Sequence, residues 1–402
     1  MKRSYLLAAF LLVSACSQAP PGPARTIATP NPGTPLVVAT ESPSISPGPS
    51  ASLSGELPQL ISGTPLPSRF RLWDLSFISH DIGWGLASYS CGGYQCAALF
   101  HTTDRWKTWQ QQVMPAAYVA QAPDTFTGCR NGAPCIAQVR FANASTGYLF
   151  GGDLFITHDG AATWTRETSP LGVIALETVG AMTLRVALCY PTSPPAAPPP
   201  TACSSYWQEL VQAEPVAGGT WRTLSTPALS GIGATILREG AQRIYVINTY
   251  GGQAGSKTLI TSNDGGSHWQ SLTLPCGDDQ IRDVAAAAGN QLFFLCFDQS
   301  KPFLHQASLD ISKDAGLTYG APLAAPYATQ GLVAGSARTI AAVDIIHGVV
   351  TSTDAGASWQ LTFDPQPPAS GYAGAWSLAF EDPLTAHFIY SGTTVWTVTF
   401  LR

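Results

Sequence analysis

The chain has 402 residues, of which 11% are charged, and a formal net charge of −5. This length exceeds one average domain, but a single β-propeller commonly runs as long. The negative charge and the lack of any Lys/Arg-rich tract exclude nucleic acid as the default partner. The 38 Gly and 32 Pro residues are typical of many short strands joined by turns.

The first residues predict an export signal rather than a folded element. Lys2 and Arg3 precede a short apolar run at residues 6–13, and Val-Ser-Ala-Cys at 13–16 resembles a bacterial lipobox. We therefore predict a lipoprotein signal peptide over 1–15, with cleavage before Cys16 and lipidation of its thiol. The alternative is an ordinary signal peptide that happens to contain Cys. No later apolar run approaches the roughly 20 residues needed to span a bilayer.

Residues 16–55 are rich in Pro, Ser and Thr and contain almost no large apolar side chain. Such a segment cannot bury enough surface to fold, so we predict a disordered tether. The protein is then expected to be exported. It would be lipid-anchored on the outer side of the cytoplasmic membrane or at the cell surface, with the lipid as its only membrane contact.

An eight-residue frame, Ser/Thr-x-Asp-x-Gly-x-Ser/Thr-aromatic, recurs through the rest of the chain. It is plainest at residues 352–359, and a worn copy without the acid survives at 218–221. The Asp side chain can accept backbone N–H groups of a tight hairpin turn, Gly supplies positive φ, and the aromatic becomes a buried anchor. Repetition favours a structural role over a catalytic one, because a catalytic acid is needed once. The structural acids are Asp104, Asp159, Asp264, Asp314 and Asp354.

The repeat period of about 40 to 55 residues is typical of a propeller. We predict an all-β fold over residues 56–402, namely a seven-bladed β-propeller of four-stranded antiparallel blades. Six or eight blades remain alternatives. The seventh repeat, from about residue 375, lacks room for a fourth strand. Residues 57–66 precede the first blade and are the candidate strand that closes the ring.

The cysteine count fits an exported protein, with one Cys for lipid and eight for disulfides. Proximity alone suggests four local pairs, although eight cysteines allow 105 connectivities. Metal ligation is less favoured because no CxxC pair or His cluster accompanies these residues, and we predict no metal and no cofactor. The proposed pairs are Cys91 with Cys96, Cys129 with Cys135, Cys189 with Cys203, and Cys276 with Cys296.

These motifs resemble the Asp-box (bacterial neuraminidase repeat) propellers, which include sialidases, xyloglucanase-type glycoside hydrolases and the photosystem II assembly/stability factor family. The assembly-factor-like group is most similar, through Gly83-Trp84 followed by the frame ending at Trp109, and Gly147-Tyr148 followed by the frame ending at Trp164. The resemblance covers nearly all of the chain after the tether and implies fold more strongly than function.

Two functions remain open from the sequence. The first is a non-enzymatic, monomeric binding or scaffold module for a protein partner at the cell envelope. The second is a secreted glycan-active enzyme or glycan-binding module. The sialidase signature is not matched, so no catalytic residue is assigned. A glycosidase needs two facing carboxylates, and the only pair we nominate is Asp74 and Asp283. Their alternative role is as polar ends of inner strands.

The working face is predicted to be the one opposite the Asp frames, where the long loops lie. In an antiparallel blade the hairpins between third and fourth strands all lie on one rim, and the variable loops lie on the other. Long loops on a rigid scaffold are where binding usually resides. The candidates are placed in those loops or at inner-strand starts, and they are Tyr94, Arg130, Arg140, Tyr250, Arg282, Asp283 and Trp376.

Overall fold

The computed structural model divides the chain into two compact units, Met1–Ser54 and Gly55–Arg402. The structure describes residues 59–400 except 121–133, 170, 190–201, 206, 231–232, 249–257, 278–279, 298–306, 327–328, 345–347, 364–377, 383 and 391. The predicted signal peptide, Cys16 and the whole predicted tether therefore lie outside the described residues. No helix among the described residues is long and apolar enough to cross a membrane.

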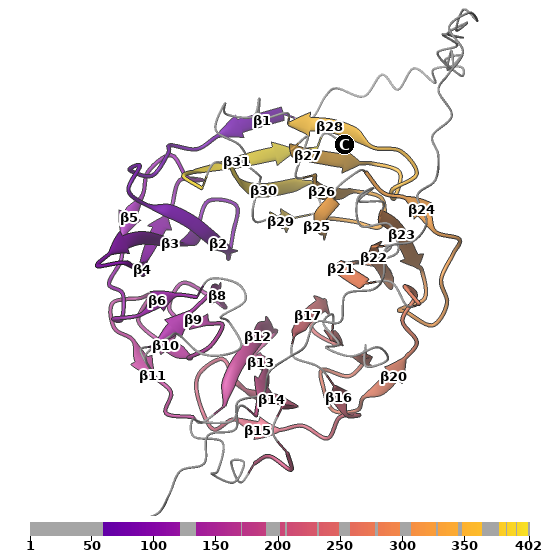
Figure 1. The fold of residues 1–402 in the computed structure, drawn as a ribbon, viewed down its shortest axis with the longest axis horizontal. Coiled ribbons are helices and arrows are strands. Elements are labelled where there is room, and N and C mark those ends of the chain that lie inside the picture. Colours follow the sequence, from indigo (N-terminus) through magenta and orange to yellow (C-terminus); the bar gives the residue numbers. More distant parts are fainter. Residues whose placement is uncertain are drawn as a thin grey trace, which may run out of the picture. The chain divides into compact units, whose positions relative to one another are not determined.

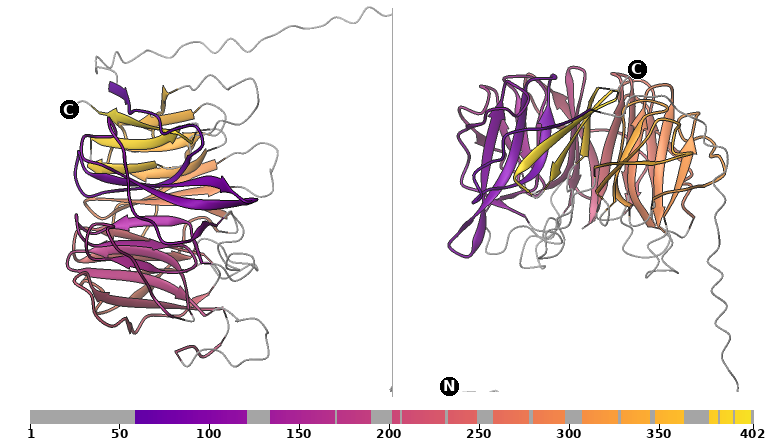
Figure 2. Two further views of the ribbon diagram at one scale, coloured as in Figure 1. Left: turned by 90° about the vertical axis from the view of Figure 1, so that its left-hand side faces the viewer. Right: turned by 90° about the horizontal axis from the view of Figure 1, so that it is seen from above.

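The second unit is a seven-bladed β-propeller, as the sequence predicts. Its seven sheets stand around a common axis, and the strands run from one face of the ring to the other (Figures 1 and 2). In blades 1 to 6 the first four strands pair antiparallel in chain order from the centre outward. Residues from successive repeats therefore become neighbours across the faces of adjacent blades.

Blades one to three follow this plan with some additions. In blade 1 the short strands β6 and β7 pair in parallel and extend the sheet beside β4, which the sequence analysis does not predict. Blade 1 contains β2 (Arg71–Phe77), β3 (Gly83–Cys91), β4 (Tyr94–Thr102), β5 (Gln110–Gln111), β6 (Tyr118–Val119) and β7 (Cys135–Ile136). Blade 2 contains β8 (Gln138–Phe141), β9 (Gly147–Phe150), β10 (Phe155–Thr157) and β11 (Thr165–Arg166). Blade 3 contains β12 (Gly172–Val179), β13 (Met182–Leu188), β14 (Gln208–Pro215), β15 (Arg222–Thr223) and β16 (Leu229–Ser230).

Blades four to six each have four strands in sequence order. Blade 4 contains β17 (Ala234–Glu239), β18 (Arg243–Asn248), β19 (Leu259–Ser262) and β20 (Gln270–Leu272). Blade 5 contains β21 (Gln280–Ala287), β22 (Gln291–Phe297), β23 (Ala307–Ser312) and β24 (Leu323–Ala324). Blade 6 contains β25 (Thr329–Ala334), β26 (Ile340–Asp344), β27 (Gly348–Ser352) and β28 (Gln360–Phe363).

The ring closes through a blade shared between the two ends of the propeller. Blade 7 contains β29 (Leu378–Asp382), β30 (Thr385–Tyr390), β31 (Thr394–Thr399) and, as its outer strand, β1 (Gln59–Ser62). Strand β1 pairs antiparallel with β31, from Gln59 opposite Thr399 to Ser62 opposite Trp396. This confirms the closing strand predicted within residues 57–66. A closed ring also leaves no blade with an unpaired face.

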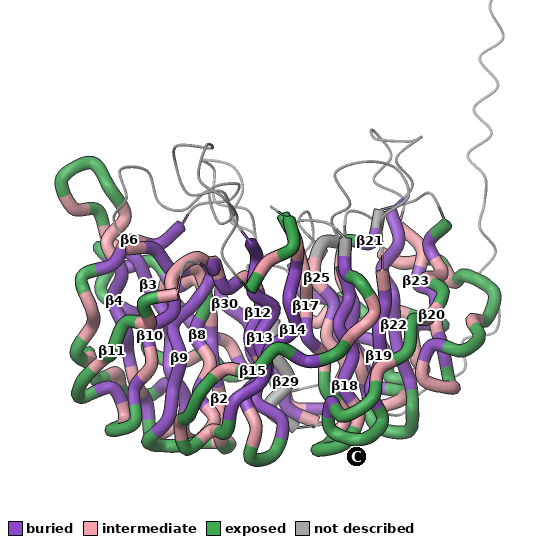
Figure 3. Tube along the Cα trace, turned by 90° about the horizontal axis from the view of Figure 1, so that it is seen from below, coloured by how far each residue is buried: buried purple, intermediate pink, exposed green. Residues whose placement is uncertain are grey.

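The hydrophobic core lies between neighbouring blades rather than at the axis. One cluster joins Phe293 and Leu309 of blade 5 to Ile340 and Val350 of blade 6. Figure 3 shows the same pattern, with buried residues along the strands and exposed residues at the turns. Because each blade buries its two faces against different neighbours, the apolar strands of one repeat depend on the next repeat for burial.

The Asp frames have the hairpin geometry that the sequence predicts. In blade 6, Oδ1 of Asp354 accepts hydrogen bonds from the backbone N–H of Ser358 and the hydroxyl of Ser352, both at 2.8 Å. The Ser358 hydroxyl donates to Oδ2 at 2.6 Å. In blade 2 the equivalent bonds from the Thr163 hydroxyl and backbone hold the pKa of Asp159 at about 2. These acids are therefore ionised caps of their own turns.

Positive φ in the frame does not require Gly. The glycine position is taken by Trp106 in blade 1 (φ 62°) and by Ala161 in blade 2 (φ 75°). In both copies the backbone N–H at this position donates to the hydroxyl of the first frame residue, Thr102 or Thr157, at 3.0 Å. The hydrogen bond to this hydroxyl therefore stabilises a positive-φ backbone conformation, which costs a non-glycine residue free energy.

Three of the frame aromatics connect adjacent blades by a hydrogen bond at the outer rim. Trp164 Nε1 of blade 2 donates to the carbonyl of Val113, which follows β5 of blade 1, at 3.0 Å. The Tyr319 hydroxyl of blade 5 donates to the carbonyl of Thr273, which follows β20, at 3.0 Å. Trp109 Nε1 of blade 1 donates to the carbonyl of Thr64, just beyond β1, at 2.7 Å. The frame therefore caps its own hairpin and also holds the preceding blade.

Candidate functional site

The innermost strands β2, β8, β12, β17, β21, β25 and β29 surround the axis of the ring (Figure 1). A cavity of about 500 Å³ lies among the first four of these strands. Its wall includes the turn after β2, so it opens at the end where first and second strands are joined. In an antiparallel blade the Asp-frame hairpins lie at this same end. The cavity is lined by Leu75, Phe77, Ile78, Ser79, Arg140, Phe141, Ala142, Glu177, Thr178, Gly180 and Arg238.

Three charged side chains from three consecutive blades meet in this cavity. Nε of Arg140 lies 3.3 Å from Oε2 of Glu177, and Nε of Arg238 lies 3.7 Å from Oε1 of Glu177. Oε1 of Glu177 also accepts the backbone N–H of Thr178 at 2.9 Å. One carboxylate therefore faces two guanidinium groups, and the three side chains together carry one net positive charge.

Arg140 is the least satisfied member of this group. Its Nε is buried and has no hydrogen bond among the described residues, because the 3.3 Å approach to Glu177 lacks hydrogen-bond geometry. Burial opposes the charge, yet Glu177 and Asp74 together hold the pKa of Arg140 above its usual value. The guanidinium is therefore charged and has donor capacity left over for a carboxylate or another acceptor.

The two carboxylates nominated as a glycosidase pair each hold the next blade. Oδ2 of Asp74 accepts the backbone N–H of Val139 in β8 at 2.9 Å. Oδ2 of Asp283 accepts the backbone N–H of Leu332 in β25 at 2.7 Å, and its Oδ1 accepts that of Val284 at 2.8 Å. Each Asp lies at a bulge in its inner strand. This geometry fits the alternative role proposed for both acids, in which they are polar residues of inner strands that are hydrogen-bonded to backbone groups.

The other predicted site residues do not gather at one place in the described structure. Tyr94 is 45% exposed and begins β4, at the face opposite the Asp frames, with its ring 5.1 Å from that of Tyr118. Arg282 is exposed, and its guanidinium carbon lies 4.3 Å from the centre of the Phe297 ring. Arg140, expected on the long-loop side, instead lies next to the turn that ends β8. Arg130, Tyr250 and Trp376 lie outside the described residues.

Glu177 and Arg238 are not among the site residues predicted from the sequence. A signal was present, because Arg140, Glu177 and Arg238 each fall within the last three residues of an inner strand in three successive repeats. A charged residue is unusual in a strand that is otherwise apolar or small. The pattern emerges only when the repeats are aligned on their first hairpins.

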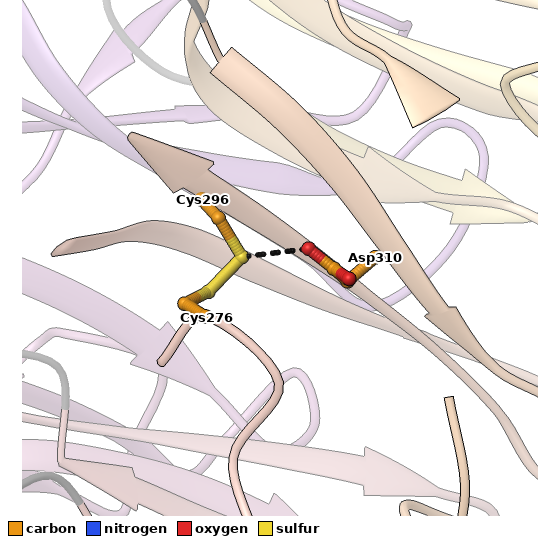
Figure 4. A group of neighbouring side chains, drawn as sticks. All are labelled: Cys276, Cys296 and Asp310. Atoms are coloured by element: carbon orange, nitrogen blue, oxygen red, sulfur yellow. Dashed lines mark hydrogen bonds between the residues drawn. A yellow bond between two sulfur atoms is a disulfide. The ribbon is translucent and has the colours of Figure 1, made fainter. Parts of the chain in front are cut away.

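Three of the four proposed disulfides are present, namely Cys91–Cys96, Cys189–Cys203 and Cys276–Cys296. Cys135 is buried and forms no disulfide with a described cysteine, while Cys129 lies outside the described residues. Figure 4 shows Cys276, Cys296 and Asp310 grouped closely enough to suggest a metal site. Oδ2 of Asp310 lies 3.1 Å from Sγ of Cys296. The disulfide occupies both sulfurs, however, so neither is a thiolate ligand in this state.

Fold and frames together define the described residues as a seven-bladed β-propeller with repeated Asp-capped hairpins. No protein-family model matches the sequence, and no curated protein matches it.

Solved structures nevertheless share this architecture. YCF48 bound to D1 peptide is similar with a TM-score of 0.56 at 13% identity, covering 86% of this chain and 98% of that chain. YCF48 from Cyanidioschyzon merolae has a TM-score of 0.55 at 13% identity, covering 85% and 98%. An oligogalacturonate lyase in complex with manganese has a TM-score of 0.54 at 7% identity, covering 87% and 98%. At these identities the likeness shows the fold alone, and these similar structures include both a peptide-bound protein and an enzyme.

Proposed function

We propose that this protein is a lipid-anchored, extracytoplasmic binding module for a protein partner, and that the partner docks at the axial cavity. The observation that carries the proposal is the half-buried Arg140 side chain, whose Nε makes no hydrogen bond among the described residues, in a cavity that opens on the ring surface. The YCF48 structure that holds a peptide supports it as a precedent for this fold.

The partner is expected to present a carboxylate, from either an acidic side chain or a chain terminus. Arg140 and Arg238 both face the carboxylate of Glu177, and Asp74 also acts on Arg140, so the cavity offers a further negative group unengaged guanidinium donors rather than excess charge. A carboxylate can accept two parallel N–H bonds from a guanidinium, which fixes orientation as well as charge. The apolar walls at Leu75 and Phe77 then bury the adjoining part of the partner segment.

The test compares peptides that differ only at one terminus. Arrayed peptides with a free C-terminal carboxylate and their C-terminal amides are screened for binding to the full chain. Arg140→Gln and Arg238→Gln should weaken binding of the carboxylate peptides about tenfold or more, since a hydrogen bond to a charged group is worth roughly 1.5–3 kcal/mol. Lys107→Gln and Lys313→Gln remove exposed cations from the outer parts of the Asp frames and should have no effect.

The opposite face is tested in the same experiment. Tyr94→Ala and Arg282→Gln alter the long-loop face predicted from the sequence. If a captured partner is lost through these two variants and retained by Arg140→Gln and Arg238→Gln, the axial cavity is not the docking site. Loss through both cavity variants with the loop variants intact supports the proposal.

The anchor is tested separately. Cys16→Ser should abolish metabolic labelling with palmitate and release the protein from membranes into the soluble fraction. Labelling that survives the replacement would show that the thiol of Cys16 does not carry the lipid. Neither result affects the binding experiment, because the propeller begins more than 40 residues after Cys16.

A further inference from the structure

Blade 3 contains the worn frame without the Asp, and charged side chains stand at buried positions of its second and third strands. Counting back from Trp221, Glu214 stands where other frames have the first Ser or Thr, and Val216 stands where they have Asp. In blades 1, 2, 4, 5 and 6 the first frame hydroxyl donates to the frame Asp. Glu214 therefore replaces a satisfied turn residue by an acid that is only 4% exposed.

A second substitution lies two residues earlier in the same strand. Arg185 and Gln212 are cross-strand partners in β13 and β14. The equivalent pair in blade 2 is Leu149 with Phe155, and in blade 4 it is Val246 with Ile260. Blade 3 thus places a guanidinium and an amide where its neighbours bury apolar side chains. Burying such groups is costly unless they are paired.

Arg185 is itself fully paired in charge. It is 2% exposed; its Nη1 donates to Oε2 of Glu167 at 2.7 Å, and its Nε donates to Oε1 of Gln212 at 2.8 Å. Its guanidinium carbon also lies 4.0 Å from the centre of the Trp221 ring. The close ion pair with Glu167 neutralises the charge of Arg185. Arg185 therefore stabilises a second carboxylate only weakly.

That second carboxylate is Glu214, and it has no hydrogen bond or ion pair among the described residues. It lines a cavity of about 570 Å³ between the outer parts of blades 2 and 3, together with Arg185 and Glu167. Burial and the nearby Glu167 raise the pKa of Glu214 to about 7, against the opposing effect of Arg185. The cavity volume is within the usual range for small-molecule sites.

We propose that this cavity binds a primary ammonium group on an alkyl chain, such as a lysine side chain of a partner or a free diamine. The ammonium supplies the hydrogen-bond donors and the positive charge that Glu214 lacks. The methylene groups of the ligand pack against Ile156, Leu171 and Trp221, which form the apolar part of the wall. This site lies at the rim of the ring, whereas the axial cavity lies among the inner strands, so its occupation is independent of the proposed function.

The probes are chosen to isolate the ammonium. Nα-acetyl-lysine methylamide and 1,5-diaminopentane are titrated by calorimetry into the full chain in detergent, with Nα-acetyl-norleucine methylamide as the uncharged control. Both amines should bind at least tenfold more tightly than the norleucine compound. The tighter of the two amines assigns the source, a protein side chain or a free diamine. Equal binding of amine and norleucine compounds would overturn the proposal.

A matched pair of variants locates the site. Glu214→Gln keeps the size of the side chain and should abolish the preference for the amine, whereas Asp81→Asn removes an exposed acid on blade 1 and should not alter it. Unchanged amine binding in Glu214→Gln would contradict the proposal.

A second measurement avoids any loss of folding in the variant. With the unaltered chain, the amine should bind more tightly at pH 8 than at pH 6, because Glu214 is then ionised. The charged or titratable groups facing it are Arg185, Glu167 and Tyr148. Binding that does not change over this range would also count against Glu214.

Discussion

Replacing Asp283 distinguishes a structural carboxylate from a catalytic one. Asp283→Ala removes the acceptor for two backbone N–H groups, those of Val284 in its own strand and Leu332 in the next blade. An unsatisfied buried N–H costs roughly 1–3 kcal/mol, and water at this partly accessible site recovers some of that loss. We therefore expect a loss of about 2 kcal/mol in the free energy of unfolding. Asp283→Asn keeps one acceptor oxygen and should lose about half as much.

Stability is measured by urea unfolding at pH 7.5. The variants are compared by their transition midpoints, which is valid where the dependence of the free energy of unfolding on urea concentration is unchanged. Asp81→Asn, an exposed acid on the same propeller, serves as the control and should leave the midpoint unchanged. The full chain and each variant are also screened for saccharide turnover. If Asp283→Ala unfolds at the same urea concentration as the unaltered chain, the blade-to-blade bond contributes nothing. If turnover is detected and this variant abolishes it, the glycosidase interpretation is restored.

Three further outcomes are expected. Trp164→Phe should cost about 1 kcal/mol more than Trp359→Phe, because of these two only the Trp164 indole N–H has an acceptor among the described residues; equal urea midpoints would contradict this. Burial raises the pKa of Glu209 to about 7, so the folded state binds its proton more tightly than the unfolded state. Stability from this group should therefore fall as pH rises from about 4.5 to about 7, and Glu209→Gln should reduce that fall in pH-dependent melting. Replacing Cys189 and Cys203 by Ala should cost about 3 kcal/mol for a loop of this length, and no change in melting temperature would exclude a stabilising disulfide.

Much of the fold could be predicted because its determinants are local and repeated. Each frame is a single hairpin whose side chains bond within eight residues, so one copy such as that of Asp354 indicates the geometry of all. The closing strand could also be predicted, because a seventh repeat without a fourth strand requires one from elsewhere. The positive φ of Trp106 could not be predicted, because it depends on a bond from its backbone N–H to the Thr102 hydroxyl that the residue pattern does not reveal.

The candidate site was less predictable because it depends on relations between repeats. Arg140, Glu177 and Arg238 are far apart in the chain, and only the packing of three blades brings their charges together. The predicted placement of Arg140 at the start of its inner strand is wrong, because β8 begins only at Gln138 and Arg140 is the residue before its last. The burial of Glu214 likewise requires knowing that blade 2 covers blade 3 at that point.

The pairing of β1 with β31 also bears on how the molecule is made. A ribosome produces the N-terminus first, so β1 must wait without its partner while six blades are synthesised and can fold behind it. Until the last strand emerges, the incomplete ring presents two unpaired edges, which are the surfaces most prone to joining other chains. The pairing of β1 with β31 joins residues that are more than 300 positions apart in the sequence, and contacts of such large sequence separation form slowly. Shortening the chain by its final strand should thus leave six folded blades exposed to polymerisation rather than a slightly smaller propeller.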